Sequence, residues 1–134
     1  KYSEQNLSFM EYDFAGEVKN SELMDFYKNN PIDLFINTSS SEGLPVSIME
    51  ACSFGIPTIA TDVGGTSEIV KDGKTGFLID ADFTPDKLAE KIKSVILLPT
   101  EKKKKLRENC RSLYLSEFFA NDNFENFAQR IKPF

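Results

Sequence analysis

The sequence predicts an α/β protein, a partial doubly wound (Rossmann-like) parallel sheet with helices on both faces and further helices at the C-terminal end. Two compact apolar runs, at 32–36 and 57–61, lack the alternation of half-exposed strands, which is typical of strands covered on both faces. Helical patterns with end signals separate these runs. With 134 residues, 40% of them hydrophobic, the chain amounts to one domain or part of one, with a feasible core.

The first part of the chain predicts a strand, a helix and a second strand. Residues 9–15 mix apolar and acidic positions and predict a short strand. Asn20-Ser21 offers an N-cap for a helix. That helix ends before Pro31, because a residue that precedes proline disfavours helical backbone. The apolar run at 32–36 follows as the second strand.

The middle of the chain predicts two further strands, separated by helical segments and turns. Pro45 suits the first turn of a helix, and Gly55 lies where that helix would end. The predicted elements are a helix over 46–54, a strand over 57–61, a turn at Gly64-Gly65, a helical turn at 68–70, a turn at Asp72-Gly73 and a strand over 76–79.

The last part of the chain predicts helices alone. Thr84 with Pro85 caps one helix, Pro99-Thr100 opens a second long one, and residues 121–131 form a third. Four phenylalanines are predicted to anchor the last helices in the core: Phe118, Phe119, Phe124 and Phe127.

The composition excludes several classes of function. The chain has a net charge of −5, whereas nucleic-acid-binding proteins are usually basic, so no nucleic acid partner is expected. The absence of histidine excludes Ser-His-Asp and Cys-His catalysis and a histidine-ligated metal. Cys52 and Cys110 lack C-x-x-C spacing and predict reduced thiols in a cytoplasmic protein. No apolar run approaches the roughly 18 residues of a membrane span, and no signal peptide is recognisable.

Basic residues gather in one late stretch. Residues 1–86 hold five basic and fifteen acidic side chains, whereas residues 87–111 hold nine basic and three acidic ones. This basic region predicts a solvated helix face. Peripheral contact with anionic lipid at the cytoplasmic membrane, or contact with a nucleic acid, is the alternative.

Two glutamates flank the predicted start of the helix over 46–54. Glu42 lies in the loop after a strand, and Glu50 lies about one turn into the helix, with Ser47 on the same face. Free amides in the first helical turn, at Val46 and Ser47, attract an anion such as a diphosphate. Because carboxylates accept hydrogen bonds from sugar hydroxyls, the pattern suits a nucleotide-sugar.

The glutamates stand within a longer pattern, Glu42-Gly43-Leu44-Pro45-Val46-Ser47-Ile48-Met49-Glu50-Ala51, followed by characteristic runs at 55–70 and 72–79. This pattern resembles the C-terminal, donor-binding domain of the family 4 retaining glycosyltransferases, which have the two-domain GT-B fold. The resemblance covers most of residues 9–97 and is strongest over 32–80.

The resemblance implies roles for six residues. The first glutamate of the motif, Glu42, would lie beside the donor sugar as the candidate catalytic residue, and the second, Glu50, would bind the ribose hydroxyls. Family backbone contacts to sugar and diphosphate carry over to Gly43, Leu44, Val46 and Ser47. Pro45 has no amide to offer. The nucleotide-sugar is a substrate, no metal or other cofactor is implied, and transfer retains the anomeric configuration through front-face departure of the diphosphate.

The resemblance also implies that residues 1–134 are a truncated donor domain. The family's Arg and Lys that neutralise the diphosphate come from two βα units that would precede residue 9. An N-terminal domain would bind the acceptor, which is a glycan, a lipid or a small molecule. We therefore expect the chain to be inactive alone and to expose an unpaired sheet edge, which favours self-association. A non-catalytic nucleotide- or sugar-binding module is the alternative.

Three further motifs have competing interpretations. Residues 72–76 resemble a P-loop but lead into a strand, so they predict a turn. Asp80 and Asp82 resemble a metal-binding D-x-D motif, although a polar lead-in to the cap at Thr84 explains them better. Gly64-Gly65 is explained either by the backbone geometry of a tight turn or by the close approach of a ligand.

Overall fold

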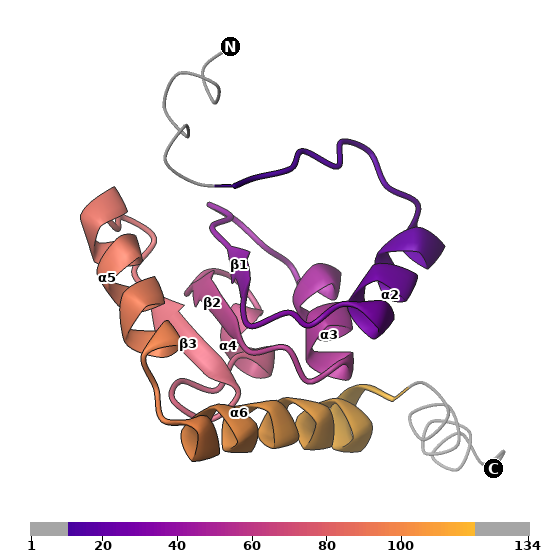
Figure 1. Cartoon of the computed structure of the whole chain (residues 1–134). Helices are drawn as coiled ribbons and strands as arrows, with labels where there is room; N and C mark the ends of the chain where they lie inside the picture. The colour runs from indigo at the N-terminus through magenta and orange to yellow at the C-terminus, as the bar shows by residue number, and fades with distance from the viewer. Residues whose placement is uncertain (1–10, 120–134) are drawn as a thin grey trace, which may run out of the picture.

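A computed structural model describes residues 11–119 of the chain. Strands and helices alternate along its first two-thirds, and helices alone follow (Figure 1). The elements are α2 (Asn20–Asn29), β1 (Phe35–Asn37), α3 (Val46–Ser53), β2 (Thr58–Thr61), α4 (Thr66–Ile69), β3 (Gly76–Ile79), α5 (Pro85–Ile96), α6 (Thr100–Leu113) and the π-helical turn η1 (Tyr114–Phe118).

The three strands form one parallel sheet in the order β1-β2-β3. In this register Phe35 lies opposite Thr58, and Thr58 lies opposite Gly76. All four residues of the central strand β2 are buried. Gly76 permits this packing, since a Cβ atom there would overlap the carbonyl oxygen of Thr58. The predicted α/β architecture with a parallel sheet is confirmed.

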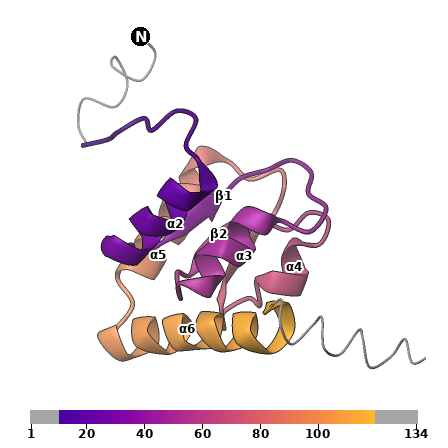
Figure 2. The same ribbon diagram turned by 90° about the vertical axis from the view of Figure 1, so that its right-hand side faces the viewer.

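Helices cover both faces of the sheet. α2, α3 and α4 lie on one side, and α5 lies on the other (Figures 1 and 2). α6 crosses below the sheet, where it contacts the segments that lead into β1 and β3 (Figure 1). Arg107 Nη1 donates to the Ile32 carbonyl at 2.6 Å, and Asn109 Nδ2 donates to the Lys74 carbonyl at 2.9 Å. The C-terminal ends of the strands, where parallel sheets bind ligands, lie at the end of the sheet away from α6.

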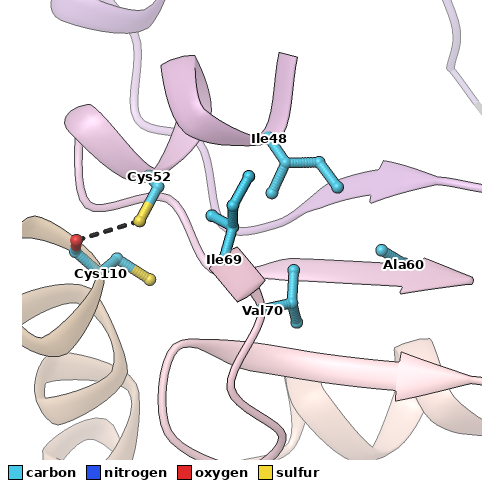
Figure 3. Packing of buried hydrophobic residues seen from close by; sticks show 6 residues of the cluster. All are labelled: Ile48, Cys52, Ala60, Ile69, Val70 and Cys110. Atoms are coloured by element: carbon cyan, nitrogen blue, oxygen red, sulfur yellow. Dashed lines mark hydrogen bonds between the residues drawn. The ribbon is translucent and has the colours of Figure 1, made fainter. Parts of the chain in front are cut away.

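The core lies between α3, β2, α4 and α6, with side chains from all four elements or their ends (Figure 3). Ile48 of α3 is 1% exposed, and burial of such a side chain contributes about 1.5–3 kcal/mol. The buried cluster consists of Ile48, Cys52, Ala60, Ile69, Val70 and Cys110.

Both cysteines in this cluster are free thiols, as predicted. The Cys52 thiol donates to the Cys110 carbonyl at 3.0 Å, and the Cys110 thiol donates to the Thr75 carbonyl at 2.8 Å. The neighbouring Cys52 thiol, and then burial, raise the pKa of Cys110. The pair therefore joins α3 and α6 to the segment that precedes β3.

Two strand predictions are corrected. Residues 11–15 form no strand, because no strand in the described part of the chain offers them a partner; residues 9 and 10 lie outside the described range. β1 is not covered on both faces as expected. Ile36 is 40% exposed, because β1 lies at the edge of the sheet beside an open groove of about 630 Å³ that residues of α2, β1, α5 and α6 line. Within residues 11–119, β1 pairs with β2 alone, so the expected unpaired edge is present.

Smaller differences concern helix ends and the last aromatic residues. α2 begins at Asn20 with Lys19 at the N-cap, and α4 begins at Thr66, earlier than predicted. Phe118 packs against the core as predicted, whereas Phe119 is 37% exposed. The predicted helix at 121–131, with Phe124 and Phe127, lies outside the described residues. Within residues 11–119, no helix combines the length and the apolar character that a bilayer crossing requires.

Candidate functional site

The candidate site lies where β1 ends and α3 begins. Asn37, the last residue of β1, donates through Nδ2 to Glu42 Oε1 at 3.1 Å and accepts through Oδ1 from the Ser39 amide at 2.9 Å. Hydrogen bonds from Ser39 and Asn37 hold the pKa of Glu42 below its usual range. The Glu42 carboxylate is therefore ionised at neutral pH and is held by the end of the strand.

A second loop, after β2, packs against the loop that carries Glu42. The Thr61 hydroxyl donates to the Ser39 carbonyl at 2.5 Å, and the Gly65 amide donates to the Gly43 carbonyl at 2.8 Å. Gly64 has a φ of +53°, and a Cβ atom there would overlap the Glu42 carbonyl oxygen. Turn geometry therefore explains Gly64, and the close approach is made by the protein's own Glu42 loop.

The first turn of α3 presents free backbone amides. Pro45 is buried at the N-cap position, and its carbonyl accepts from the Ile48 and Met49 amides at 3.1 and 3.2 Å. The Val46 and Ser47 amides have no acceptor within the described residues. Val46 is 62% exposed, so this end of the helix is open. The helix dipole adds a partial positive charge there.

Glu50 lies one turn further along α3 and faces α2. Its Oε1 accepts from Asn20 Nδ2 at 2.6 Å. Burial, and then the charge of Glu50, raise the pKa of Tyr27 on α2. The Tyr27 ring also packs edge-to-face on Phe54, with centroids 5.8 Å apart. These contacts attach α2 to α3 at the level of Glu50.

The six predicted site residues thus lie in a single βα unit. Glu42 follows β1, Glu50 lies in α3, and the segment between them supplies Gly43, Leu44, Val46 and Ser47. Asn37 was not among the predicted site residues, and Asn20, predicted to cap α2, contacts Glu50 instead. The signal for Asn37 was a polar residue at the end of an apolar strand, where ligand-facing groups of parallel sheets gather.

The rival motifs have structural explanations. Gly73 has a φ of +69° in a turn that enters β3, and Asp72 Oδ1 accepts from the Leu78 amide at 2.9 Å. This confirms a turn in place of a P-loop helix. The Asp80 carbonyl accepts from the Phe83 amide, and the Thr84 hydroxyl caps α5. Between residues 11 and 119, no three Asp, Glu or Cys side chains gather as a metal site.

The basic region lies on α5 and α6, outside the β1–α3 unit that carries Glu42. Its two arginines bond main-chain carbonyls, Arg107 at Ile32 and Arg111 at Ser53, the last residue of α3. Most of its lysines are exposed, as a solvated face requires; those on α6 are Lys102, Lys104 and Lys105, with Lys103 half-buried. These cations are not part of the candidate site.

Comparison with known proteins identifies the family. The sequence model of the family described as Glycosyl transferases group 1 matches residues 7–113. The chain belongs to this family. A lipopolysaccharide core biosynthesis mannosyltransferase, LpsB, from Rhizobium meliloti is 41% identical over 71 residues, which are 52% of this chain and 19% of LpsB.

Solved structures agree on the fold of this group 1 glycosyltransferase domain, which is that of GT-B proteins. Sucrose-phosphate synthase from Thermosynechococcus elongatus matches with a TM-score of 0.80 and 24% identity over 95% of this chain and 31% of that one. HepE of Anabaena, crystallised with UDP-glucose, matches with a TM-score of 0.65 and 28% identity over 73% of this chain and 27% of HepE. The chain thus spans less than a third of each of these relatives.

Proposed function

We propose that this chain is the donor-binding part, a partial C-terminal GT-B domain, of a retaining family 4 glycosyltransferase. The whole enzyme would move a sugar from a nucleotide-sugar to an acceptor hydroxyl. Glu42 would lie beside the donor sugar as the catalytic carboxylate, and Glu50 would bind the ribose hydroxyls. The backbone amides that would contact sugar and diphosphate are those of Gly43, Leu44, Val46 and Ser47.

The observation that carries this proposal is the arrangement of groups along the β1–α3 unit. Along the chain, the free amides of Val46 and Ser47 come between two carboxylates, Glu42, which is held at the end of β1, and Glu50, which lies on α3. Amides at a helix N-terminus suit a diphosphate, and carboxylates suit sugar hydroxyls. HepE, a relative that was crystallised with UDP-glucose, adds support for a nucleotide-sugar as the ligand class.

The proposed transfer keeps the anomeric configuration. The bond between the anomeric carbon and the diphosphate oxygen breaks, and the acceptor oxygen bonds to the same face of that carbon. The acceptor proton passes to the departing diphosphate oxygen. Glu42 would hold and polarise the sugar without shuttling a proton. The proposal assigns no metal or other cofactor, and the nucleotide-sugar is a substrate.

We propose that the 134-residue chain is inactive on its own. A departing diphosphate needs neutralising cations, and both arginines of the described residues bond main-chain carbonyls away from the site. An acceptor glycan, lipid or small molecule would be bound by another part of a longer protein. Turnover of any nucleotide-sugar by the purified chain would contradict this part of the proposal.

Calorimetry with uridine, guanosine and adenosine diphosphate sugars tests the donor site. We expect one nucleotide to bind the chain selectively and Glu50→Ala to weaken that binding at least about tenfold, the effect of a lost hydrogen bond to a charged group. Glu108→Ala on the exposed surface of α6 is the matched control and should bind like the unchanged chain. Equal affinities for the unchanged chain and both variants would contradict the assignment of Glu50.

A non-catalytic nucleotide- or sugar-binding module is the second candidate. The excess of acidic residues over residues 1–86 and the engagement of both arginines of the described residues elsewhere favour it. A longer protein that contains this chain would distinguish the two, because a transferase would release nucleoside diphosphate from its donor, and Glu42→Gln would abolish that release. A module would bind without turnover.

We place the protein in the cytoplasm, because both cysteines are free thiols. Peripheral contact of the α6 lysines with a membrane is a separate proposal. Vesicles with anionic lipid should retain the chain at low salt, and the double change Lys102→Glu and Lys105→Glu should release it. Equal retention on neutral vesicles would contradict an electrostatic contact.

A further inference from the structure

We propose that Asn37 is a positioning residue, whose side-chain amide holds the Glu42 carboxylate in the orientation that donor binding requires. The catalytic meaning of this inference rests on the function proposed above. The contact itself does not, because it joins two residues of the chain. Asn37 Nδ2 lies 3.1 Å from Glu42 Oε1.

The backbone of Asn37 is fixed by the sheet. Asn37 ends β1 and is paired in register with Ala60 of the central, fully buried strand β2. Its side chain is half-buried and uses both ends of the amide. Nδ2 donates to Glu42, while Oδ1 accepts from the Ser39 amide at 2.9 Å and thereby closes the turn that follows the strand.

The loop between these residues is held from a second strand as well. The Thr61 hydroxyl, at the end of β2, donates to the Ser39 carbonyl at 2.5 Å. The Gly65 amide donates to the carbonyl of Gly43, the residue that follows Glu42. The ends of two neighbouring strands thus determine where the Glu42 carboxylate lies, and Asn37 is the strand residue that contacts the carboxylate itself.

An asparagine suits this position better than residues of similar shape. Aspartate would keep the acceptor for the Ser39 amide but would place a second negative charge beside Glu42. Leucine would lose both the donor and the acceptor. Since Asn37→Asp preserves the turn while it removes the donor, it separates positioning of Glu42 from folding of the loop.

The first test measures the Glu42 carboxyl by NMR titration of the unliganded 134-residue chain, with Glu42→Gln to assign its signal. We expect Asn37→Asp to raise the pKa of Glu42, and Asn37→Leu to raise it less. Asn29→Asp is the control, because Asn29 Nδ2 bonds the Asp25 carbonyl on the surface of α2. An unchanged pKa of Glu42 in a folded Asn37→Asp variant would overturn the proposal. If Asn37→Leu does not fold, Asn37→Asp alone decides.

The second test measures the dissociation constant of the preferred nucleotide-sugar. We expect Asn37→Asp to weaken binding about tenfold or more at neutral pH, because the donor to Glu42 is replaced by a second negative charge. Unchanged affinity would refute a positioning role in donor binding. If the unchanged chain binds no nucleotide-sugar but the NMR shift occurs, the proposed function fails and the Asn37–Glu42 contact stands.

Discussion

Asn20, the first residue of α2, donates its side-chain amide to Glu50 of α3 at 2.6 Å, across 30 residues of sequence. Sequence rules place an asparagine at a helix start as a cap for its own backbone. Here no side chain caps α2, and the amide of Asn20 instead orients a carboxylate on a neighbouring helix. The contact places Glu50 against α2 and the ring of Tyr27.

The charge of Glu50 should be measurable through Tyr27. Burial raises the pKa of Tyr27 first, and Glu50 raises it further, so Glu50→Gln should lower that pKa part of the way toward its ordinary value. NMR titration of the Tyr27 ring measures this change, and Glu22→Gln, an exposed residue of α2, is the control. A raised pKa gives stability that is present below about pH 10 and is lost above it. An unchanged Tyr27 pKa in Glu50→Gln would contradict the contact.

Glu42 should give the folded chain an acid-sensitive stability. Because the pKa of Glu42 is lowered on folding, its contribution is present above its unfolded value of about 4.3 and is lost as pH falls further. Urea unfolding at several pH values should therefore show a smaller loss toward acid for Glu42→Gln than for the unchanged chain. Parallel curves for the two proteins would show that the hydrogen bonds from Ser39 and Asn37 add nothing to stability.

Gly64 should tolerate substitution worse than Gly73. Both have positive φ, +53° and +69°, but a Cβ at Gly64 would overlap the Glu42 carbonyl, whereas nothing lies within 4 Å of one at Gly73. We expect Gly73→Ala to cost about 1 kcal/mol of unfolding free energy and Gly64→Ala to cost about 3 kcal/mol or more. Chemical denaturation provides both values. Equal losses would mean that the loop with Gly64 and the loop with Glu42 move apart freely to make room for the Cβ.

Arg107 should stabilise the N-terminal end of the sheet. Its guanidinium donates to the Ile32 carbonyl at 2.6 Å, between α6 and the segment before β1. Arg107→Met keeps the apolar stem and removes this bond, so we expect a loss of about 1–2 kcal/mol. Lys104→Met, an exposed residue on the same helix, should change stability by less than about 0.5 kcal/mol. Denaturant titration compares the two, and similar losses would contradict a structural role for Arg107.

The free edge of β1 should promote self-association. The Phe35 amide bonds the Pro57 carbonyl toward β2, so the amide and carbonyl of Ile36 point to the open edge. Light scattering of the 134-residue chain should report a mass that grows with concentration, and Ile36→Lys should suppress the growth by placing a charge at the edge. Lys28→Ala on α2 is the control. A monomer at every concentration would contradict this prediction.

Local sequence signals were enough for most elements. The β3 bounds, the Thr84 cap of α5 and the start of α6 after Pro99 follow from turn and cap residues that act within a few positions. The pattern from Glu42 to Glu50 also indicated a glycosyltransferase, and the match over residues 7–113 confirms the group 1 glycosyltransferase family. Membership of family 4 stays a prediction. The roles of the six site residues stay predictions, which the proposed binding experiments test.

Tertiary structure alone decided the rest. Residues 11–15 have a strand-like composition but no partner within the described chain, and Ile36 is exposed because a strand's burial depends on its neighbours. The bonds from Asn37 and Asn20 to the two glutamates likewise depend on where β1 and α2 dock. Amino-acid order by itself determined which carboxylates and free amides share one βα unit, because that is local geometry. What holds each carboxylate was determined by packing between elements, which no local pattern encodes.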